Sequence, residues 1–157
     1  MKRIAVISDS HQAQVRVNQF IELAKKERFD EIIFCGDGLD DLRRIEREVG
    51  MSCMSVAGNC DWFSREKDTP REFAVKIAGV TLMATHGDRY DVKWQMDALS
   101  YRAEELGAQV ALFGHTHKQT AGYCGNVMMV NPGALKLGYY AVLELDSGKC
   151  EPRLMRL

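Results

Sequence analysis

Short apolar runs alternate with amphipathic segments along the first third of the chain. The strand-like runs cover residues 2–8, 31–35 and 51–57, and the helix-like segments cover residues 15–28 and 40–49, the second ending at Gly50. The runs have the length of buried strands, whereas the longer segments repeat apolar positions at the spacing of one helix face. Strands and helices that alternate in this way are typical of a layered α/β domain.

The rest of the chain predicts a hairpin, one long helix and several short strands. Residues 72–78 and 80–85 indicate two strands that meet at a glycine turn. Residues 91–106 form the longest helix-like stretch, followed by Gly107 as a C-cap and by a strand at residues 109–113. Residues 119–157 contain short strands separated by turns at Gly125, Asn131-Pro132-Gly133 and Asp146-Ser147-Gly148. No repeat or linker interrupts this order, so we expect a single domain over residues 1–157.

All four histidines of the chain lie in short polar clusters that follow predicted strands. The clusters are Asp9-Ser10-His11, Gly36-Asp37-Gly38, Gly58-Asn59-Cys60-Asp61, Thr85-His86-Gly87 and Gly114-His115-Thr116-His117. In open α/β sheets, ligands collect outside the carboxyl ends of the strands. We therefore expect these five loops to converge on one point.

The residue types in these clusters are those that bind divalent cations. Imidazole nitrogens and carboxylate oxygens are ligands of borderline and hard divalent ions. The candidate metal ligands are Asp9, His11, Asp37, Asn59, His86, His115 and His117. Seven candidates suggest two ions, with Asp37 as the carboxylate that bridges them. A single motif of this kind is more often a surface turn, and it is the combination, with no histidine elsewhere, that favours a metal site.

The spacing within the clusters has a physical reason. Asp9 and His11, like His115 and His117, are two positions apart, which places both side chains of a pair on the same side of an extended strand end. Glycines let the backbone turn sharply and come close to an ion or a phosphate group. The glycines in the clusters are Gly36, Gly38, Gly58, Gly87 and Gly114.

Composition narrows the class of protein. With 157 residues, 46% of them hydrophobic and 27% charged, the chain is typical of a globular protein rather than a disordered one. A net charge of −1 without a run of Lys or Arg disfavours a nucleic-acid partner. No apolar stretch reaches the roughly 18 residues of a membrane span, and the five cysteines lack C-x-x-C spacing. We expect a cytoplasmic protein with reduced thiols and no thiolate-rich zinc site. The sequence is compatible with a monomer and with a homo-oligomer.

The ordered set Asp-x-His, Gly-Asp, Gly-Asn-x-Asp, His-Gly and Gly-His-Thr-His resembles the calcineurin-like metallophosphoesterases, in particular their small bacterial and archaeal phosphodiesterase branch. The resemblance covers about residues 1–135, and Asn131-Pro132-Gly133 resembles a further signature of the family. It implies an α/β fold in which two mixed β-sheets pack as a sandwich flanked by helices, a four-layer arrangement. It also implies two divalent ions, most often Mn²⁺, with Ni²⁺, Fe²⁺, Zn²⁺ or Co²⁺ as alternatives.

Carried over by residue, the resemblance implies one ion among Asp9, His11, Asp37 and His117. The second ion is implied among Asp37, Asn59, His86 and His115. A hydroxide held between the ions would attack phosphorus in line, so we expect a hydrolase of small phosphate esters. The expected catalytic residues are Asp37, Asn59 and Cys60, and the expected substrate contacts are Asn59 and Arg89.

Cys60 stands where the larger family usually carries a histidine that assists the leaving group. A thiol with a reference pKa of about 8.5 is a poor acid beside an imidazolium. We therefore expect a phosphodiesterase rather than a monoesterase, acting on esters whose leaving group departs without a proton. The alternative for Cys60 is a small buried apolar side chain.

Other residues near the clusters allow two interpretations each. Asp61 is favoured as a cap or brace of its loop, and Asp88, which stands where many small-branch relatives have another His, is expected to point to a supporting partner or to solvent. Arg89 could contact phosphate or remain a solvated surface residue. Trp62 and Phe63 could form an apolar wall for a substrate base or ring, or bury against a neighbouring subunit.

Two other function classes compete with the hydrolase. The first is a non-catalytic metal-binding interaction module, like the eukaryotic retromer subunit that resembles this branch. Every expected ligand position is filled here, which counts against it. The second is a phosphomonoesterase or a nuclease, and the absence of a basic patch counts against a nuclease.

Overall fold

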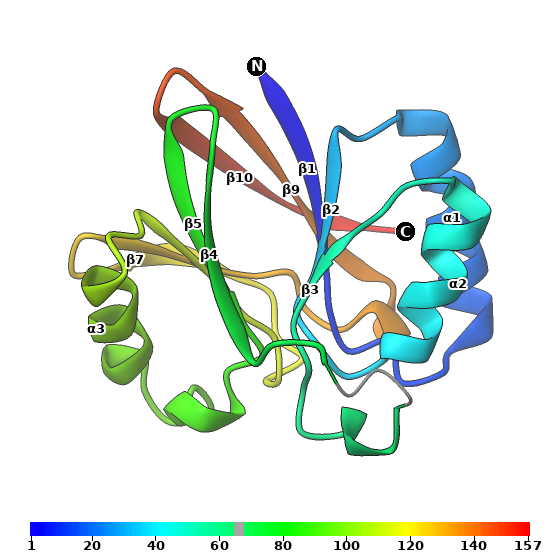
Figure 1. The fold of residues 1–157 in the computed structure, drawn as a ribbon, viewed down its shortest axis with the longest axis horizontal. Helices are drawn as coiled ribbons and strands as arrows, with labels where there is room; N and C mark the ends of the chain where they lie inside the picture. Colours follow the sequence, from blue (N-terminus) through cyan, green and yellow to red (C-terminus); the bar gives the residue numbers. More distant parts are fainter. Residues whose placement is uncertain (65–67) are drawn as a thin grey trace.

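The fold consists of two five-stranded sheets that pack face to face, with helices on both outer faces (Figure 1). It was obtained as a computed structural model that describes residues 1–64 and 68–157. The polar residues from Asn59 to Arg71 predict a loop between the strand-like runs at 51–57 and 72–78, and part of this loop lies outside the described residues.

The first sheet contains both ends of the chain. Its strands, in spatial order, are β10 (Lys149–Arg156), β9 (Tyr139–Asp146), β1 (Lys2–Ile7), β2 (Glu31–Phe34) and β3 (Met54–Ser55). The strands β1, β2 and β3 are parallel, whereas β9 runs antiparallel to β1 and to β10. Helices α1 (Gln14–Glu27) and α2 (Leu39–Val49) connect the parallel strands. The expected strand at 51–57 is confirmed only for its two central residues, Met54 and Ser55.

The second sheet begins with the predicted hairpin, which forms its first two strands. Its strands, in spatial order, are β4 (Glu72–Ile77), β5 (Val80–Thr85), β6 (Val110–Leu112), β8 (Val127–Asn131) and β7 (Thr120–Cys124). The central strands β5, β6 and β8 are parallel, and the edge strands β4 and β7 are antiparallel to their neighbours. Short 3-10 helices occur at Asp61–Phe63 (η1), Asp88–Tyr90 (η2) and Leu135–Leu137 (η3).

The long helix expected at 91–106 is wrong in its first third. Helix α3 covers only Asp97–Glu105. Asp91 has a φ of +53°, a left-handed conformation that a right-handed helix cannot contain. The Gln95 side chain accepts hydrogen bonds from the amides of Asp97 at 2.7 Å and Ala98 at 3.3 Å, so it caps the helix start. The expected end is confirmed, because Gly107 directly follows the last turn with a φ of +68°.

Three apolar layers hold the four structural layers together. Along β1, Ala5 and Ile7 pack toward α1 and α2, whereas Ile4 and Val6 pack toward the second sheet, as the twofold period of a strand requires. A third cluster, which includes Leu99, joins α3 to the outer face of the second sheet. The expected sandwich of two mixed sheets flanked by helices is confirmed.

The carboxyl ends of the parallel strands lie at one edge of the sandwich. The loops that follow β1, β2, β3, β5 and β6 gather at the lower edge in Figure 1. This edge is called the rim below. Within the described part of the chain, no helix has the length and apolar character that crossing a membrane requires.

Candidate metal centre

Two buried aspartates and a buried histidine form the centre of the rim. Asp9 and His86 are fully buried, and Asp37 is 3% exposed. His11, His115 and His117 are partly exposed around them. A buried carboxylate is costly unless it is paired or binds a cation. The sequence prediction that these loops converge is confirmed for these six side chains.

The Asp9 carboxylate contacts histidines from three loops. Its Oδ1 lies 3.1 Å from His117 Nε2, 3.4 Å from His11 Nε2 and 3.9 Å from His86 Nε2. Its Oδ2 accepts hydrogen bonds from the Ser8 hydroxyl at 2.7 Å and the His115 amide at 3.0 Å. One oxygen is therefore held by the protein, while the other faces the imidazole rings.

The Asp37 carboxylate lies between the same rings. Its Oδ2 is 3.1 Å from His86 Nε2 and 3.7 Å from His11 Nε2, and its Oδ1 accepts a hydrogen bond from the Cys60 amide at 2.8 Å. Burial raises the pKa of Asp37, but the close approach and charge of His86 and the hydrogen bonds from Cys60 outweigh burial and lower this pKa to about 2. Asp37 is therefore an anion at neutral pH.

His86 is oriented by a backbone carbonyl group. Its Nδ1 lies 2.7 Å from the Cys35 carbonyl oxygen, which can only accept, so Nδ1 carries a proton. Its Nε2 is left facing Asp9 and Asp37. Burial lowers the pKa of His86, whereas the Asp37 carboxylate next to its Nε2 and the charges of Asp9 and Asp37 raise it, and the net direction is upward.

The donor set fits a divalent cation. Two buried ring nitrogens, His11 Nε2 and His86 Nε2, have no hydrogen-bond partner among the described residues. Three groups of side chains each offer ligand atoms within 4.8 Å of one another: Asp9, His11 and His117; Asp9, Asp37 and His86; and His11, Asp37 and Cys60. Buried nitrogens without partners beside two carboxylates are what a cation between them would satisfy.

His115 and His117 complete the ring of imidazoles. The His115 ring lies 5.0 Å from that of His86, and the His117 ring lies 5.2 Å from that of His11, measured between ring centroids. Burial and the charge of His86 lower the pKa of His115, and burial lowers that of His117 against the charge of Asp9. Both rings are therefore neutral near pH 7, the form that binds a metal.

The expected strand-end geometry of the paired motifs is wrong. Asp9 and His11 have φ values of +54° and +44°, and His115 and His117 have values of +67° and +62°, so neither pair is extended. The side chains converge through left-handed turns, which Asp and His tolerate better than most residues. Asp37, with a φ of +63°, shares this conformation.

Two glycines are required because the backbone comes very close to the aspartates. A Cβ atom at Gly58 would lie 2.1 Å from Asp37 Oδ1. A Cβ atom at Gly114 would lie 2.6 Å from Asp9 Oδ2 and 2.0 Å from the Ser8 hydroxyl. Side chains at either position would therefore displace a candidate ligand.

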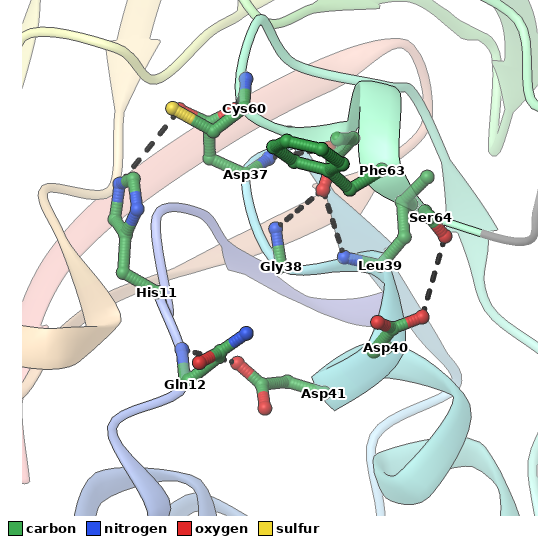
Figure 2. Close-up of a pocket in the computed structure, with 11 residues that line it drawn as sticks. His11, Gln12, Asp37, Gly38, Leu39, Asp40, Asp41, Cys60, Phe63 and Ser64 are labelled. Carbon is green, nitrogen blue, oxygen red and sulfur yellow. Dashed lines mark hydrogen bonds and ion pairs between the residues drawn. The ribbon is translucent and has the colours of Figure 1, made fainter.

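Asp61 fixes the loop that carries Asp37. Its carboxylate accepts hydrogen bonds from the amides of Asp37 at 2.7 Å, Gly38 at 2.8 Å, Leu39 at 3.1 Å and Gly58 at 2.7 Å. The dashed lines that reach Gly38 and Leu39 in Figure 2 are two of these bonds. Asp61 thus caps the N-terminus of α2 and braces the loop, as favoured from the sequence.

Sequence reasoning missed two polar residues that hold the rim loops. Asp41 accepts hydrogen bonds from the Ser10 hydroxyl at 2.6 Å and the Gln12 amide at 2.9 Å, on both sides of His11. Arg71 donates to Asp88 at 2.6 Å and to the Gly58 carbonyl at 3.4 Å. Nothing in the spacing of Asp41 or Arg71 distinguished them from ordinary surface charges.

The Asn131-Pro132-Gly133 turn supports the loop of His115. Asn131 is fully buried, and its amide nitrogen donates to the Gly114 carbonyl and the Thr116 hydroxyl, both at 2.9 Å. Its side-chain oxygen accepts from the Gly133 amide at 2.9 Å. This turn therefore orients the histidine pair without contacting the carboxylates.

The remaining expected site residues lie farther out. Cys60 Sγ faces the His11 ring in Figure 2, and burial, followed by the negative charge of Asp37, raises the pKa of this thiol. Asn59 is exposed, and its side-chain amide donates to Cys60 Sγ at 3.6 Å. Arg89 is exposed near Glu72, whose pKa it helps to lower, so the expected phosphate contact of Arg89 stays a prediction.

The geometry agrees with comparisons to known proteins. A family model described as the calcineurin-like phosphoesterase superfamily domain matches residues 1–148. The chain belongs to this superfamily. The family resemblance predicted from the ordered motifs is therefore confirmed, and it supports a metal-dependent phosphoester hydrolase.

This phosphoesterase is similar in sequence to bacterial and archaeal proteins, and similar in fold to a eukaryotic one. The probable metallophosphoesterase YsnB of Bacillus subtilis is 32% identical over 150 residues, covering 92% of this chain and 85% of the relative. A phosphodiesterase of Methanocaldococcus jannaschii is 24% identical over 144 residues, covering 83% and 82%. The crystal structure of a Vps29 mutant from Entamoeba histolytica has a TM-score of 0.77 at 19% identity and covers 99% of each chain, which shows a common fold.

Proposed function

We propose that the protein is a phosphodiesterase that uses two divalent cations. The ligand set predicted from its sequence would hold them, and Mn²⁺ is the expected ion. The observation that carries the proposal is the position of Asp37 Oδ2 between the His86 and His11 Nε2 atoms, at 3.1 and 3.7 Å. Neither nitrogen has a hydrogen-bond partner among the described residues. A carboxylate shared by two such nitrogens is suited to bridge two cations.

The chain supplies position and charge for phosphoryl transfer. When bound, divalent cations supply Lewis acidity and lower the pKa of water. Asp9 and Asp37 provide the fixed negative charge that holds the cations, and the Asp61 and Ser8 hydrogen bonds keep both carboxylates in place. Asn59, at the exposed side of the rim, is assigned to the phosphate oxygens as a hydrogen-bond donor.

Two features support diesters over monoesters. The Cys60 thiol has a raised pKa, so it is a weaker acid than an ordinary thiol and donates a proton poorly to a leaving group. The archaeal relative with 24% identity is named a phosphodiesterase. Esters whose leaving group departs as an anion are therefore the substrates that this site suits best.

The first experiment measures hydrolysis of bis(p-nitrophenyl) phosphate and p-nitrophenyl phosphate with and without Mn²⁺. We expect Mn²⁺-dependent turnover, faster for the diester, and at least about a 100-fold loss in Asp37→Asn because a bridging charge is removed. Asp97→Asn, which changes an exposed aspartate of α3, is the matched control and should keep full activity.

The same experiment separates the proposal from a non-catalytic interaction module. Bound Mn²⁺ is counted by metal analysis after removal of the free ion. Two bound ions without turnover of either ester would reject the hydrolase and favour the module. Turnover that persists in metal-free protein would reject the metal site as the catalytic centre.

A further inference from the structure

A cavity of about 290 Å³ opens directly beside the candidate metal centre. It shares His11 and Asp37 with the centre, and Cys60, Phe63 and the first turn of α2 form its other walls (Figure 2). Ligand pockets start at roughly 300 Å³, so this cavity suits one compact ester group of a substrate, such as a sugar with a single ring system, rather than a whole dinucleotide. A phosphate at the metal centre would therefore place one of its ester groups here.

Phe63, which lines the cavity, is stacked on the neighbouring Trp62 to form an exposed aromatic pair. Trp62 is 74% exposed and Phe63 is 78% exposed, and their rings stack with centroids 3.5 Å apart and planes 28° apart. Both belong to the 3-10 turn that begins at Asp61, and the Ser64 amide closes that turn on the Asp61 carbonyl at 2.9 Å. The stacked pair is thus fixed to the same residue that braces the Asp37 loop.

One acidic side chain of the cavity can accept a hydrogen bond from a ligand. Asp41 and Asp61 are engaged by their loop donors, and Asp37 belongs to the metal centre. The Asp40 carboxylate is exposed in the cavity and accepts from the Ser64 hydroxyl at 3.3 Å. Asp40 therefore offers its remaining lone pairs to a hydroxyl or amine donor.

The charge of the walls restricts the ligand further. The described lining residues include four aspartates and neither Lys nor Arg. A second phosphate group in this cavity would be repelled by the aspartates among these described lining residues. The group bound here is therefore uncharged or cationic, has a flat face for stacking and carries a hydrogen-bond donor.

We propose that the cavity binds the nucleoside group of a phosphodiester substrate, with its base stacked on Phe63 and a sugar hydroxyl donating to Asp40. This inference rests on the proposed function, because it places the phosphate at the metal centre. It assigns Phe63 and Asp40 as residues that determine specificity. Stacking on an aromatic side chain is tolerant of base identity, so no single base is favoured.

The test compares two diesters that release the same leaving group. Thymidine 5′-(p-nitrophenyl) phosphate and methyl p-nitrophenyl phosphate differ only in the group that the cavity would hold. We expect kcat/KM to be at least about fivefold higher for the nucleoside ester, with the gain mainly in KM, because stacking adds binding energy. Phe63→Ala and Asp40→Asn should each reduce this ratio.

Tyr123→Ala removes an aromatic residue of β7 that is 74% exposed, and it serves as the matched control. It should keep the wild-type ratio. A ratio near one in the wild-type protein, or a ratio that survives in Phe63→Ala, would overturn the inference while leaving the phosphodiesterase intact. If neither ester is hydrolysed, the proposed function fails instead.

A binding measurement without turnover tests the nucleoside cavity independently of catalysis. Calorimetric titration of the Mn²⁺-loaded protein compares adenosine 5′-monophosphate with methyl phosphate, which carry the same phosphate group. We expect the nucleotide to bind at least about fivefold more tightly and Phe63→Ala to abolish the difference. Equal affinities for the two ligands would reject the nucleoside cavity whether or not the protein is an enzyme.

Discussion

Five of the candidate ligands hold a left-handed backbone conformation: Asp9, His11, Asp37, His115 and His117. Each such non-glycine residue costs about 1 kcal/mol or more, which the surrounding structure must offset. Hydrogen bonds between the loops contribute to this, such as that from the Asp9 amide to the Gly36 carbonyl at 2.9 Å. The conformation that turns these side chains toward one another therefore lowers the free energy of unfolding.

A substitution at Cys60 tests the chemistry of the leaving group. In Cys60→His, an imidazolium that is charged below a pKa near 6.5 could donate a proton to the departing oxygen. We expect the rate to depend less steeply on leaving-group pKa than in the wild-type protein. A series of aryl phosphodiesters with graded leaving-group pKa measures this slope.

Cys60→Ser provides the control, because a hydroxyl is close in shape to a thiol, though smaller, and is a still weaker acid that does not donate a proton to the leaving group at neutral pH. Its slope should match that of the wild-type protein. A slope that is unchanged in Cys60→His would reject the role given to this position.

The candidate ligands of the site can be identified from the sequence, but the residues that hold the ligand loops in place cannot. His86 and Asp37 could be identified because metal ligands belong to few residue types and stand beside glycines. Asp41 and Arg71 could not, since a buried hydrogen bond between loops leaves no periodic pattern. The left-handed turns were also beyond prediction, because the φ of Asp9 is imposed by contacts with loops distant in the chain.

At the scale of elements, Asp61 joins the N-terminus of α2 to the metal centre. A carboxylate at a helix N-terminus satisfies free amides and interacts favourably with the helix dipole. Here one Asp61 oxygen accepts from the amides of Gly38 and Leu39, and the other accepts from those of Asp37 and Gly58. The position of α2 and the position of Asp37 are therefore coupled through one side chain.

Asp61→Asn should weaken both the helix and the metal site. The amide has one accepting oxygen instead of two and no charge, so we expect the metal-free protein to lose about 2 kcal/mol in its free energy of unfolding. Urea denaturation measures this loss, and calorimetry should show weaker Mn²⁺ binding.

Asp40→Asn is the matched control, because Asp40 also lies in the first turn of α2 but is exposed. It should change the unfolding free energy by less than about 0.5 kcal/mol. Equal losses in the two variants would contradict the capping role of Asp61.

Element prediction succeeded where apolar pattern and turn residues agreed. The hairpin of β4 and β5 follows from two apolar runs around Gly79, and the structure confirms the hairpin, with β4 ending at Ile77 opposite Val80. It failed at residues 91–106, where helical spacing continues through Asp91 although that residue is left-handed. Local pattern does not reveal such a break, because the Gln95 side chain caps the helix from within the predicted segment.

At the scale of the molecule, pH acts on metal-free and metal-bound protein in opposite directions. The raised pKa of His86 stabilises the metal-free fold fully below the unfolded value of 6.5, and this stability is lost as pH rises through the raised pKa. The lowered pKa of Asp37 stabilises the fold above the unfolded value of 3.8, and this stability is lost as pH falls through about 2.

A cation must displace the proton on His86 Nε2, so Mn²⁺ binds more tightly as pH rises. We expect the increase in Tm caused by Mn²⁺ to be small near pH 6 and several degrees larger near pH 8. Thermal denaturation with Mn²⁺ and with a chelator measures the increase at each pH. The same increase at both pH values would show that His86 does not exchange its proton for the ion.

The hydrogen bond between His86 Nδ1 and the Cys35 carbonyl joins the two sheets, because Cys35 follows β2 and His86 follows β5. Behind it lie Ile33 and Leu82, in the apolar layer between the sheets. Any exchange there that alters side-chain volume changes the sheet spacing and with it the gap between His86 and the aspartates. The geometry of the metal centre thereby limits which side-chain volumes can be exchanged in the apolar layer during evolution.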